Sequence, residues 1–467
     1  MTKLNTYAKL FGAMNLQSSY QELLDKTSKK ERKNINIYIG LSGGVDSSVG
    51  AYLLKKDGFN VKGIYMHCFS SDDPKCRANQ NRADAIKVAS FLKIPIEIWD
   101  FEKEYKKSVI DYFFSEYKKG NTPNPDILCN SEIKFKLFLN QALEKGADYV
   151  ATGHYAKILY LENGKLQNTN SKQILISKPH DSKEIRNTSI SNNNIVCYEY
   201  SKLKIKNLKS HNNSINDKLE ERQNHYYIAS GEDMWKDQSY FLSKVQNDVL
   251  NKILFPLGEL YKNKIKGETL GYKSTRKIAN SIRLPVCKKP DSTGICFLDG
   301  IDFQQFLRTK LSEKEGNVYN LTNQKIGTHK GICFYTIGQR HDFVIKKYIG
   351  KPLYVIRKDI KKNRLYVGTK ENLYKNKLSI NSVQLKIPEN SFNSLVGDKK
   401  IFVRIRNLGD FCHVISFKKN KNNEFILRLE KPLFSIAPGQ FAVFYYIDTF
   451  GKKNTEEKII IGSGVIF

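Results

Sequence analysis

The fold of this chain is decided near its start, over Ile35 to Met66, which reads INIYIGL, SGGVDSS, VGAYLLKKDGF and NVKGIYM. The first run alternates isoleucine with other residues, as expected for a strand. After the Ser/Gly-rich run, Val45, Val49 and Leu53 recur at helical spacing until Gly58 ends the pattern. A second apolar run follows. Strand, loop, helix and strand in this order predict a βαβ unit with a parallel crossover.

The loop between the first strand and the helix, Ser42-Gly43-Gly44-Val45-Asp46-Ser47-Ser48, has the chemistry of an anion site. Its glycines let the backbone approach a ligand closely, and its serines add hydroxyl donors. The helix N-terminus behind it adds a partial positive charge that suits phosphate. Asp46 repels phosphate, so we expect it to act through bound Mg²⁺ or to orient the loop. An ordinary Gly-Ser turn is the alternative, which the strand and helix on either side disfavour.

The charge balance points to a polyanionic partner. The chain has 77 Lys and Arg against 47 Asp and Glu, a net charge of +30. Clustered cations release counterions when they bind nucleic acid, so RNA or DNA is the partner that we expect. A generally lysine-rich composition is the alternative explanation. With 467 residues the chain is too long for a single core, and two or three domains are expected.

Targeting signals and cysteine spacing bear on the compartment. We expect no membrane span, because no window approaches 18 consecutive apolar residues. The first 34 residues do not resemble a secretory signal, but they contain no acid before Glu22, so an organellar matrix is the alternative to the cytoplasm. Eight cysteines include no Cys-x-x-Cys pair. A reducing compartment with a few functional thiols therefore fits better than a disulfide scaffold or a protein cage for a metal.

The pattern along the chain predicts an α/β domain followed by two β-rich domains. Helices are expected at Asn79–Leu92 and Tyr105–Lys118, with a strand at Ile94–Trp99 between them. Beyond residue 300, Gly-containing turns separate runs rich in Val, Ile, Phe and Tyr. The predicted parts are a basic N-terminal extension (1–34), an α/β domain (35–299) with an Asn/Ser-rich, partly disordered insertion (163–224), a central β-rich domain (300–372) and a C-terminal β-barrel (373–467).

A Pro-rich loop should bring a thiol to the mouth of a helix. Gly120–Asp126 contains two prolines and is not expected to be helical. The next helix is expected over Ser131–Lys145, with Asn130 as its cap. Cys129 would lie just ahead of that helix. The helix dipole should then lower the pKa of the Cys129 thiol, which the pH dependence of alkylation would test.

Two more segments are candidates for the same crevice. Gly153 and His154 follow a short apolar run that reads as a buried strand, and ligands of open parallel sheets lie beyond such strand ends. Cys296 lies near the end of a turn-rich loop, Lys288–Asp299. Cys129 and Cys296 are far apart in the sequence, so only the tertiary fold could bring them together. For each of them an inert buried thiol is the alternative.

These residues carry a resemblance to a known family. The SGGVDSS loop resembles the phosphate loop of the PP-loop ATP pyrophosphatases, which adenylate a substrate oxygen and release pyrophosphate. Six further peptides resemble the tRNA-specific 2-thiouridylases and occur in that family's order. They are NPDILCN at 124–130, ATGHY at 151–155, KDQSYF at 236–241, DSTGICF at 291–297, YTIGQR at 335–340 and PGQ at 438–440.

The resemblance implies a PP-loop fold, ATP with Mg²⁺ and a defined reaction. O2 of the wobble uridine, position 34 of tRNA, is adenylated, and sulfur then replaces it to give 2-thiouridine with release of AMP and pyrophosphate. By resemblance Cys296 carries the persulfide, Cys129 resolves it through a Cys129–Cys296 disulfide, and Asp126 is a possible acid or base, a turn-capping Asp being the alternative. The implied ATP contacts are Gly40, Leu41, Ser42, Gly43, Gly44, Val45, Asp46, Ser47, Met66 and Gly153.

The resemblance also implies contacts with tRNA and with protein partners. The target base would be flipped into the protein, as base-modifying enzymes require. The implied partners are tRNAs of the Lys, Glu and Gln type and a sulfur carrier or cysteine desulfurase relay. A PP-loop amidating ligase for a small molecule and a non-catalytic RNA-binding protein are the alternatives. The implied tRNA and base contacts are Asn124, Pro125, Asp126, His154, Lys236, Asp237, Gln238, Arg406, Asn407 and Gln440.

Overall fold

A computed structural model describes residues 18–71, 73–161, 225–263, 274–291, 295, 298–347, 350–421, 424–450 and 455–467. All of these residues belong to one structural unit. The predicted insertion at 163–224 and the predicted persulfide cysteine, Cys296, lie outside the described residues. No helix in the described ranges is both long enough and apolar enough to cross a membrane.

The first sheet confirms the predicted βαβ unit. Its five strands are all parallel, in the order β3-β2-β1-β4-β7. The chain runs outward from β1 to β2 and β3, and later fills the other side with β4 and β7, so the order reverses between β1 and β4. Ligands bind at such a reversal. The strands are β1 (Asn36–Gly40), β2 (Asn60–His67), β3 (Ile96–Asp100), β4 (Tyr149–Ala151) and β7 (Ile253–Leu254).

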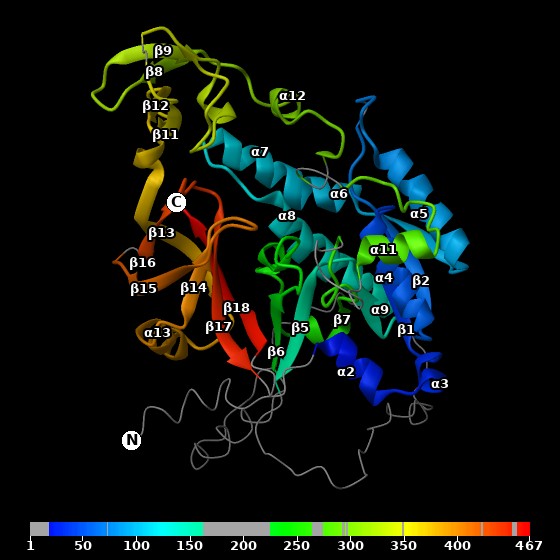
Figure 1. The fold of residues 1–467 in the computed structure, drawn as a ribbon. Coiled ribbons are helices and arrows are strands. Elements are labelled where there is room, and N and C mark those ends of the chain that lie inside the picture. The colour runs from blue at the N-terminus through cyan, green and yellow to red at the C-terminus, as the bar shows by residue number, and fades with distance from the viewer. Residues whose placement is uncertain are drawn as a thin grey trace, which may run out of the picture. The chain divides into compact units, whose positions relative to one another are not determined.

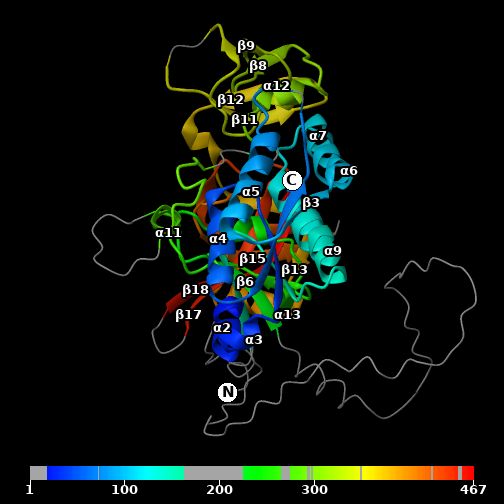
Figure 2. The same ribbon diagram turned by 90° about the vertical axis from the view of Figure 1, so that its right-hand side faces the viewer.

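Helices cover both faces of this sheet (Figures 1 and 2). Because successive side chains of a strand point to opposite faces, Ile37 and Ile39 pack in one cluster with α4 and α5, while Tyr38 packs in another with α7 and η2. Both faces of β1 are therefore buried. The helices of this domain are α4 (Val45–Lys56), α5 (Ala78–Leu92), α6 (Glu102–Tyr105), η1 (Lys106–Ile110), α7 (Asp111–Lys118), α8 (Pro125–Leu128), η2 (Cys129–Phe138), α9 (Leu139–Glu144) and α11 (Thr275–Ser281).

The helix predicted at Ser131–Lys145 begins earlier than expected. It starts with α8 at Pro125 and continues through η2 and α9. Proline is tolerated at the first helical position because its missing N–H would have no partner there. The cap is Asn124, whose Oδ1 accepts the N–H of Ile127 at 3.4 Å, and not Asn130. Cys129 consequently lies inside the helix, one turn from its start, and not ahead of it.

The N-terminal extension packs on this domain through its described part. α2 (Ser19–Lys26) and α3 (Lys29–Arg32) form there. The Tyr20 hydroxyl donates to Asp57 Oδ2 at 2.5 Å, and Arg32 Nη1 donates to the Asp57 carbonyl at 3.0 Å. Both contacts lie at the C-terminal end of α4, so these two helices extend the α/β domain.

The central domain is the small β-rich unit that the sequence predicted. α12 (Phe303–Arg308) leads into a sheet of order β10-β9-β8-β12-β11. Its strands are β8 (Gly316–Tyr319), β9 (Lys325–His329), β10 (Val344–Ile345), β11 (Tyr354–Asp359) and β12 (Arg364–Gly368). Short 3₁₀ turns elsewhere in the chain are η3 (Ser239–Leu242), η4 (Leu250–Lys252), η6 (Ile332–Phe334) and η7 (Lys370–Leu373).

The C-terminal domain is a closed antiparallel barrel, as predicted. Its order is β13-β16-β15-β14-β17-β18, and β18 pairs with β13 to close the ring. Phe392 of α13 (Glu389–Gly397) is buried in the barrel core. The strands are β13 (Tyr374–Leu385), β14 (Ile401–Arg404), β15 (Cys412–Lys419), β16 (Phe425–Phe434), β17 (Phe441–Phe450) and β18 (Thr455–Ile466).

A hairpin joins the α/β domain to the barrel, and the sequence did not indicate it. β5 (Ala156–Leu161) and β6 (His225–Ser230) pair antiparallel, and β6 pairs in turn with β18 through Ala229 and Ile459. The barrel sheet therefore continues into a hairpin that directly follows β4 and the predicted site residue His154. The predicted insertion falls between the two strands of this hairpin.

Candidate active site

A cavity of about 540 Å³ opens where the predicted phosphate loop, β2, β4 and the start of α8 meet. It lies beyond the carboxyl ends of the parallel strands, at the reversal of strand order, where a ligand site is expected. Most of the predicted ATP contacts line it, as do Asp126, Cys129 and His154. Three further predicted tRNA contacts also line the cavity: Lys236, Gln238 and, from the barrel domain, Asn407.

The phosphate loop is held in shape by its own serines. Ser47 Oγ accepts the N–H of Ser42 at 3.2 Å and donates to the carbonyl of Gly44 at 3.3 Å, and Ser48 Oγ donates to the same carbonyl at 2.6 Å. Gly43 has φ +72, and a Cβ there would lie 2.2 Å from the Asn81 carbonyl oxygen. The loop therefore turns tightly into α4 at a place that only glycine fits.

Gly153 packs directly against the first turn of α4, at a distance that leaves no space for a side chain. A Cβ on Gly153 would lie 2.6 Å from the backbone nitrogen of Ser47 and 2.8 Å from the carbonyl carbon of Asp46. On the other side, a Cβ on Gly40 would lie 2.9 Å from Met66 Cε, so Met66 closes over the end of β1. The predicted contacts from β1, β2 and β4 are thus gathered around one helix N-terminus.

Asp46 anchors a buried lysine. Its Oδ1 accepts from Lys262 Nζ at 2.6 Å and from the Tyr155 hydroxyl at 2.8 Å. The Lys262 side chain is only 4 % exposed and also pairs with Asp291 Oδ1 at 2.9 Å. Of the two roles expected for Asp46, these contacts are those of a residue that orients the loop and its surroundings.

A second lysine contacts the phosphate loop directly. Lys289 Nζ donates to the carbonyl of Gly43 at 3.0 Å, to Asn81 Oδ1 at 2.7 Å and to Asp84 Oδ2 at 2.7 Å. Lys262 and Lys289 both line the cavity, and neither was among the predicted site residues. Their partners are far away in the sequence, so no local pattern marked them. They add the positive charge that this loop lacks by itself.

Asp291 forms ion pairs with several basic side chains on this side of the cavity. Lys236 Nζ lies 2.7 Å from its Oδ2, and Arg276 Nη2 lies 2.6 Å from its Oδ1. Partial burial opposes ionisation, but hydrogen bonds from Lys236 and Lys262 outweigh it and hold the pKa of Asp291 well below its usual value. The predicted tRNA contact Lys236 is thus fixed at the cavity wall by a permanently charged carboxylate.

The Pro-rich loop ahead of Cys129 is held by the barrel domain. The N–H of Thr122 donates to the carbonyl of Pro438 at 2.7 Å. Gln440 Nε2 donates to the Thr122 carbonyl at 2.9 Å, and Gln440 Oε1 accepts from Asn124 Nδ2 at 3.3 Å. Gly439 has φ +92, and a Cβ there would lie 2.9 Å from the Thr122 nitrogen. The PGQ peptide therefore docks against the loop that leads to Asp126.

His154 is buried at the cavity wall and neutral. Its Nδ1 lies 2.7 Å from Thr152 Oγ1, and its ring packs against Phe135 and Phe255 with centroids 5.9 and 5.7 Å away. Burial, with a smaller contribution from nearby Lys134, holds the pKa of His154 well below its usual value. A neutral imidazole offers one donor and one acceptor.

Asp237, a predicted tRNA contact, is buried away from the cavity. Its side chain is 3 % exposed and pairs with Arg404 Nη1 of β14 at 2.8 Å. Its Oδ1 also accepts the N–H groups of Gly231 and Ser239 at 3.1 and 3.0 Å. In this structure Asp237 ties the segment before Gln238 to the barrel. Gln238 itself lines the cavity, and its Oε1 accepts the N–H of Tyr155 at 3.1 Å.

Two amide oxygens at the cavity have no partner. Among the described residues, Asn130 Oδ1 and Asn407 Oδ1 are buried without a hydrogen bond, and both residues line the cavity. A buried acceptor without a donor costs about 1–3 kcal/mol, so a ligand that donates there gains that amount. The neighbouring predicted contact Arg406 is exposed and donates through Nη2 to the Ser435 carbonyl at 3.1 Å.

Three described cysteines line the cavity: Cys68, Cys76 and Cys129. Only Cys129 was among the predicted site residues, and it is buried. Asp291 and Asp299, on either side of Cys296 in the sequence, also line the cavity. Because Cys296 is outside the described residues, the Cys129–Cys296 disulfide stays a prediction.

One group of metal-ligand type occurs among the described residues. His67, Asp100 and Glu102 bring ligand atoms within 4.8 Å of one another at the ends of β2 and β3. Ser70 Oγ donates to Glu102 Oε1 at 2.9 Å, and Asp100 Oδ1 accepts the Glu102 N–H at 2.9 Å. These bonds account for the positions of both carboxylates without an ion.

Comparisons with known proteins cover nearly the whole chain. Family models described as tRNA methyl transferase HUP domain, tRNA methyl transferase PRC-barrel domain and aminomethyltransferase beta-barrel domain match residues 35–184 with 185–300, 304–369 and 377–466. The tRNA-specific 2-thiouridylase MnmA 1 of Geobacillus kaustophilus is 34% identical over 93% of this chain and 96% of its own. The tRNA-specific 2-thiouridylases MnmA of Lactiplantibacillus plantarum (33%; 93% and 96%) and Staphylococcus aureus (34%; 89% and 93%) are similar.

Proposed function

The chain belongs to the tRNA-specific 2-thiouridylase family, and on this premise we propose that it is an ATP-dependent sulfurtransferase that converts the wobble uridine of tRNA to 2-thiouridine. The observation that carries the proposal is a single cavity that joins a phosphate loop to a buried thiol, Cys129, and to unpaired amide oxygens. A small-molecule amidating ligase is not favoured, because the relatives that match over the full length carry the tRNA name.

The phosphate-loop end of the cavity fits ATP. Gly43 and Gly153 let the backbone pack closely around the α4 N-terminus, and Lys262 and Lys289 supply cations beside it. When bound, ATP supplies the leaving group that makes an oxygen displaceable. We propose that Mg²⁺ accompanies the phosphates, that the remaining loop residues contact ATP as the family resemblance implies, and that Asp46 keeps Lys262 aimed at the loop.

The other end of the cavity suits a flipped uracil. Uracil has a single base N–H, at N3, and two carbonyl oxygens, so its recognition needs an acceptor in the protein. Asn130 Oδ1 and Asn407 Oδ1 are buried acceptors in need of a donor. Asp126 also lines the cavity and is proposed as the acid or base. Asn124 and Pro125 would complete the base contacts.

The proposed reaction has three steps. Uridine O2 attacks the α-phosphorus of ATP, and pyrophosphate leaves. The terminal sulfur of a persulfide on Cys296 then attacks C2, and O2 leaves as part of AMP. Finally the Cys129 thiolate attacks the Cys296 sulfur, which breaks the S–S bond to the base and releases 2-thiouridine with a Cys129–Cys296 disulfide. A dithiol reductant must reopen that disulfide before the next turnover.

We also propose which tRNAs are the substrates and which proteins supply the sulfur. The substrates are tRNAs of the Lys, Glu and Gln type, and the persulfide comes from a sulfur carrier or a cysteine desulfurase relay. The net charge of +30 supports a polyanionic substrate. We propose a cytoplasmic location, with an organellar matrix as the alternative.

Nucleoside mass spectrometry tests the function directly. Unmodified tRNA is incubated with the protein, ATP, Mg²⁺, a small-molecule persulfide and a dithiol reductant, digested, and analysed for 2-thiouridine. Cys129→Ser should abolish multiple turnover, whereas Cys412→Ser, which changes a buried thiol in the barrel, should retain it. Wild-type protein that leaves the wobble uridine unsulfurated with every reagent present would end the proposal.

A further inference from the structure

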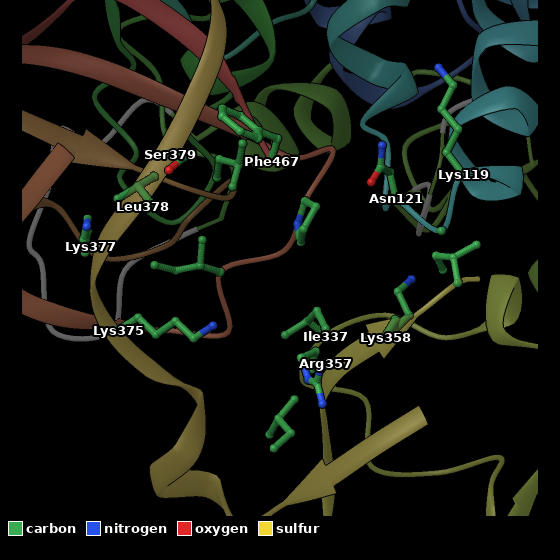
Figure 3. Close-up of a pocket in the computed structure, with 16 residues that line it drawn as sticks. Lys119, Asn121, Ile337, Arg357, Lys358, Lys375, Lys377, Leu378, Ser379 and Phe467 are labelled. Atoms are coloured by element: carbon green, nitrogen blue, oxygen red, sulfur yellow. The ribbon is translucent and has the colours of Figure 1, made fainter. Parts of the chain in front are cut away.

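A second pocket, of about 420 Å³, lies among the end of α7, β11, β13 and the C-terminal residues of the barrel (Figure 3). It shares no lining residue with the active-site cavity. None of the site residues predicted from the sequence lines it. It nevertheless has a definite chemical character, because its lining combines basic and apolar side chains.

Five basic side chains line the pocket. They are Lys119, Arg357, Lys358, Lys375 and Lys377, and no acidic side chain is among the described residues that line the pocket. Figure 3 shows these side chains on different sides of the opening. Of these five, only Lys119 has a carboxylate within 4 Å among the described residues, Glu116 at 2.7 Å. A pocket with this charge attracts an anion that carries several negative groups.

Two of these cations are held in place before any ligand binds. The Arg357 guanidinium lies 3.7 Å from the centroid of the Tyr366 ring. Lys358 Nζ donates to the Tyr335 carbonyl at 2.5 Å. Burial lowers the pKa of Lys358 to about 8, so its ammonium is poorly solvated and gains from a nearby anion. Lys375 and Lys377 are exposed on β13 and are free to follow a ligand.

The apolar wall is a surface of branched aliphatic side chains. It is made by Ile337, Ile356, Ile360, Ile436, Pro438 and Ile466. Gly120, with φ +78, packs on Ile360, because a Cβ there would lie 2.1 Å from Ile360 Cδ1. Isolated phosphate has no use for such a wall, whereas a nucleotide has both a phosphate and a flat apolar base face.

We propose that this pocket binds a nucleotide of the tRNA other than the target uridine, with its phosphates on the lysines and its base against the isoleucines. This inference rests on the proposed function. A nucleic acid is favoured over an acidic protein because the pocket combines cations with apolar side chains and because it adjoins the loop of residues 120–126, the substrate loop. The chemistry gives no base preference, since every base has an apolar face.

The pocket adjoins the loop that carries the proposed base contacts. Lys119, Gly120 and Asn121 line the pocket, and Asp126, a few residues later, lines the active-site cavity. Five residues span at most about 18 Å when fully extended. Pro438, the first residue of the PGQ peptide that holds this loop, also lines the pocket. The pocket is therefore within reach of nucleotides a few positions from a uridine in the active site.

The test uses the full-length protein and a matched pair of double variants. Lys375→Ala/Lys377→Ala removes two exposed cations of the pocket, and Lys30→Ala/Lys33→Ala removes two exposed cations at α3. The dissociation constant for unmodified tRNA is measured by fluorescence anisotropy between 0.05 and 0.5 M salt. Two lost phosphate contacts should reduce the magnitude of the salt slope by about 1.4 and weaken binding about tenfold at physiological salt. The α3 variant should bind like wild type.

A crosslinking measurement reports on the apolar wall independently. The tRNA carries 4-thiouridine in its anticodon loop outside the wobble position, and the crosslinked peptides are identified by mass spectrometry. Crosslinks to the peptides that carry Ile360 or Ile436 support the proposal. Crosslinks confined to other parts of the chain overturn it.

Three further outcomes would also show whether the pocket binds tRNA. If wild type thiolates tRNA while the pocket variant keeps the wild-type affinity and salt slope, the inference is wrong. If the pocket variant binds tRNA normally but loses activity only when a protein supplies the sulfur, the pocket serves an acidic protein and the inference is also wrong. If wild type binds tRNA but does not thiolate it, the proposed function fails, while the binding data still decide the role of the pocket.

Discussion

Gln440 offers a sharp test of how the barrel contributes to the active site. Family resemblance implies that this residue contacts tRNA, but the structure shows its side chain engaged with the loop of residues 122–124. If Gln440 positions that loop, Gln440→Ala should loosen it even when no tRNA is present. Gln440→Glu is the matched variant, because it keeps the shape and loses both amide donors.

The size of the effect follows from three contacts. Gln440 Nε2 donates to the Thr122 carbonyl at 2.9 Å and, at 3.4 Å, to that of Pro123, and Oε1 accepts from Asn124 at 3.3 Å. A typical hydrogen bond contributes about 0.5–1.5 kcal/mol, and the two long ones lie at the low end of that range. The loss of all three hydrogen bonds should cost about 1.5–2 kcal/mol, or roughly a 10- to 30-fold fall in kcat/KM for tRNA. The Kd for ATP should stay unchanged.

Two assays separate positioning from direct contact. Thiolation kinetics with tRNA in limiting concentration give kcat/KM, and amide hydrogen exchange of the free protein follows the Thr122 N–H, which is now bonded to Pro438 at 2.7 Å. Positioning predicts faster exchange at Thr122 in Gln440→Ala and in Gln440→Glu. A fall in kcat/KM with wild-type exchange in the free protein would refute this reasoning and assign Gln440 to the tRNA interface.

Four other perturbations have defined outcomes. Gly153→Ala should weaken ATP binding at least tenfold by calorimetry, because its Cβ would lie 2.6 Å from Ser47 N, while tRNA affinity stays unchanged. Lys289→Met should likewise weaken ATP binding about tenfold, and weaker binding of tRNA alone would contradict its assignment. Asp237→Asn leaves Arg404 buried without a counter-charge and should lower the free energy of unfolding by about 3 kcal/mol in urea, whereas the exposed Asp410→Asn should not. The pKa of His154 is held below its usual value, so below about pH 6.5 the unfolded state binds the proton first and the stability of the folded protein falls. His154→Asn should therefore lose less Tm than wild type between pH 7 and pH 5.5. An equal loss of Tm would contradict the lowered pKa.

The parts of the fold that the sequence predicted are those with local signals. The βαβ unit follows from alternation in β1, helical spacing in α4 and the turn at Gly58, all within one short stretch. The helix predicted at Asn79–Leu92 is α5, which spans Ala78–Leu92. The start of α8 was missed because proline was taken as excluding a helix, whereas Pro125 occupies the one helical position that needs no N–H.

The site residues that the sequence missed depend on distant partners. Lys262 meets Asp46, and Lys289 meets Asn81 and Asp84, across more than 200 positions of sequence. A lysine in a lysine-rich chain is by default a solvated surface cation, so nothing in the local sequence distinguishes these two. The same limit applies to the buried role of Asp237, whose partner Arg404 belongs to another domain.

These long-range contacts bear on what the barrel does. Among the barrel residues that reach the catalytic domain, Gln440 holds the substrate loop, Arg404 pairs with Asp237 beside Gln238, and Asn407 brings an unpaired acceptor to the cavity. A domain that only bound tRNA would not need to set the conformation of the loop before Cys129 or to supply a buried acceptor beside it. The barrel is therefore part of the active site, because without it the substrate loop loses its hydrogen bonds and the cavity loses one wall. These contacts couple the position of the barrel to the geometry around Cys129, since any shift of Gln440 is transmitted through Thr122 and Asn124 to the start of α8.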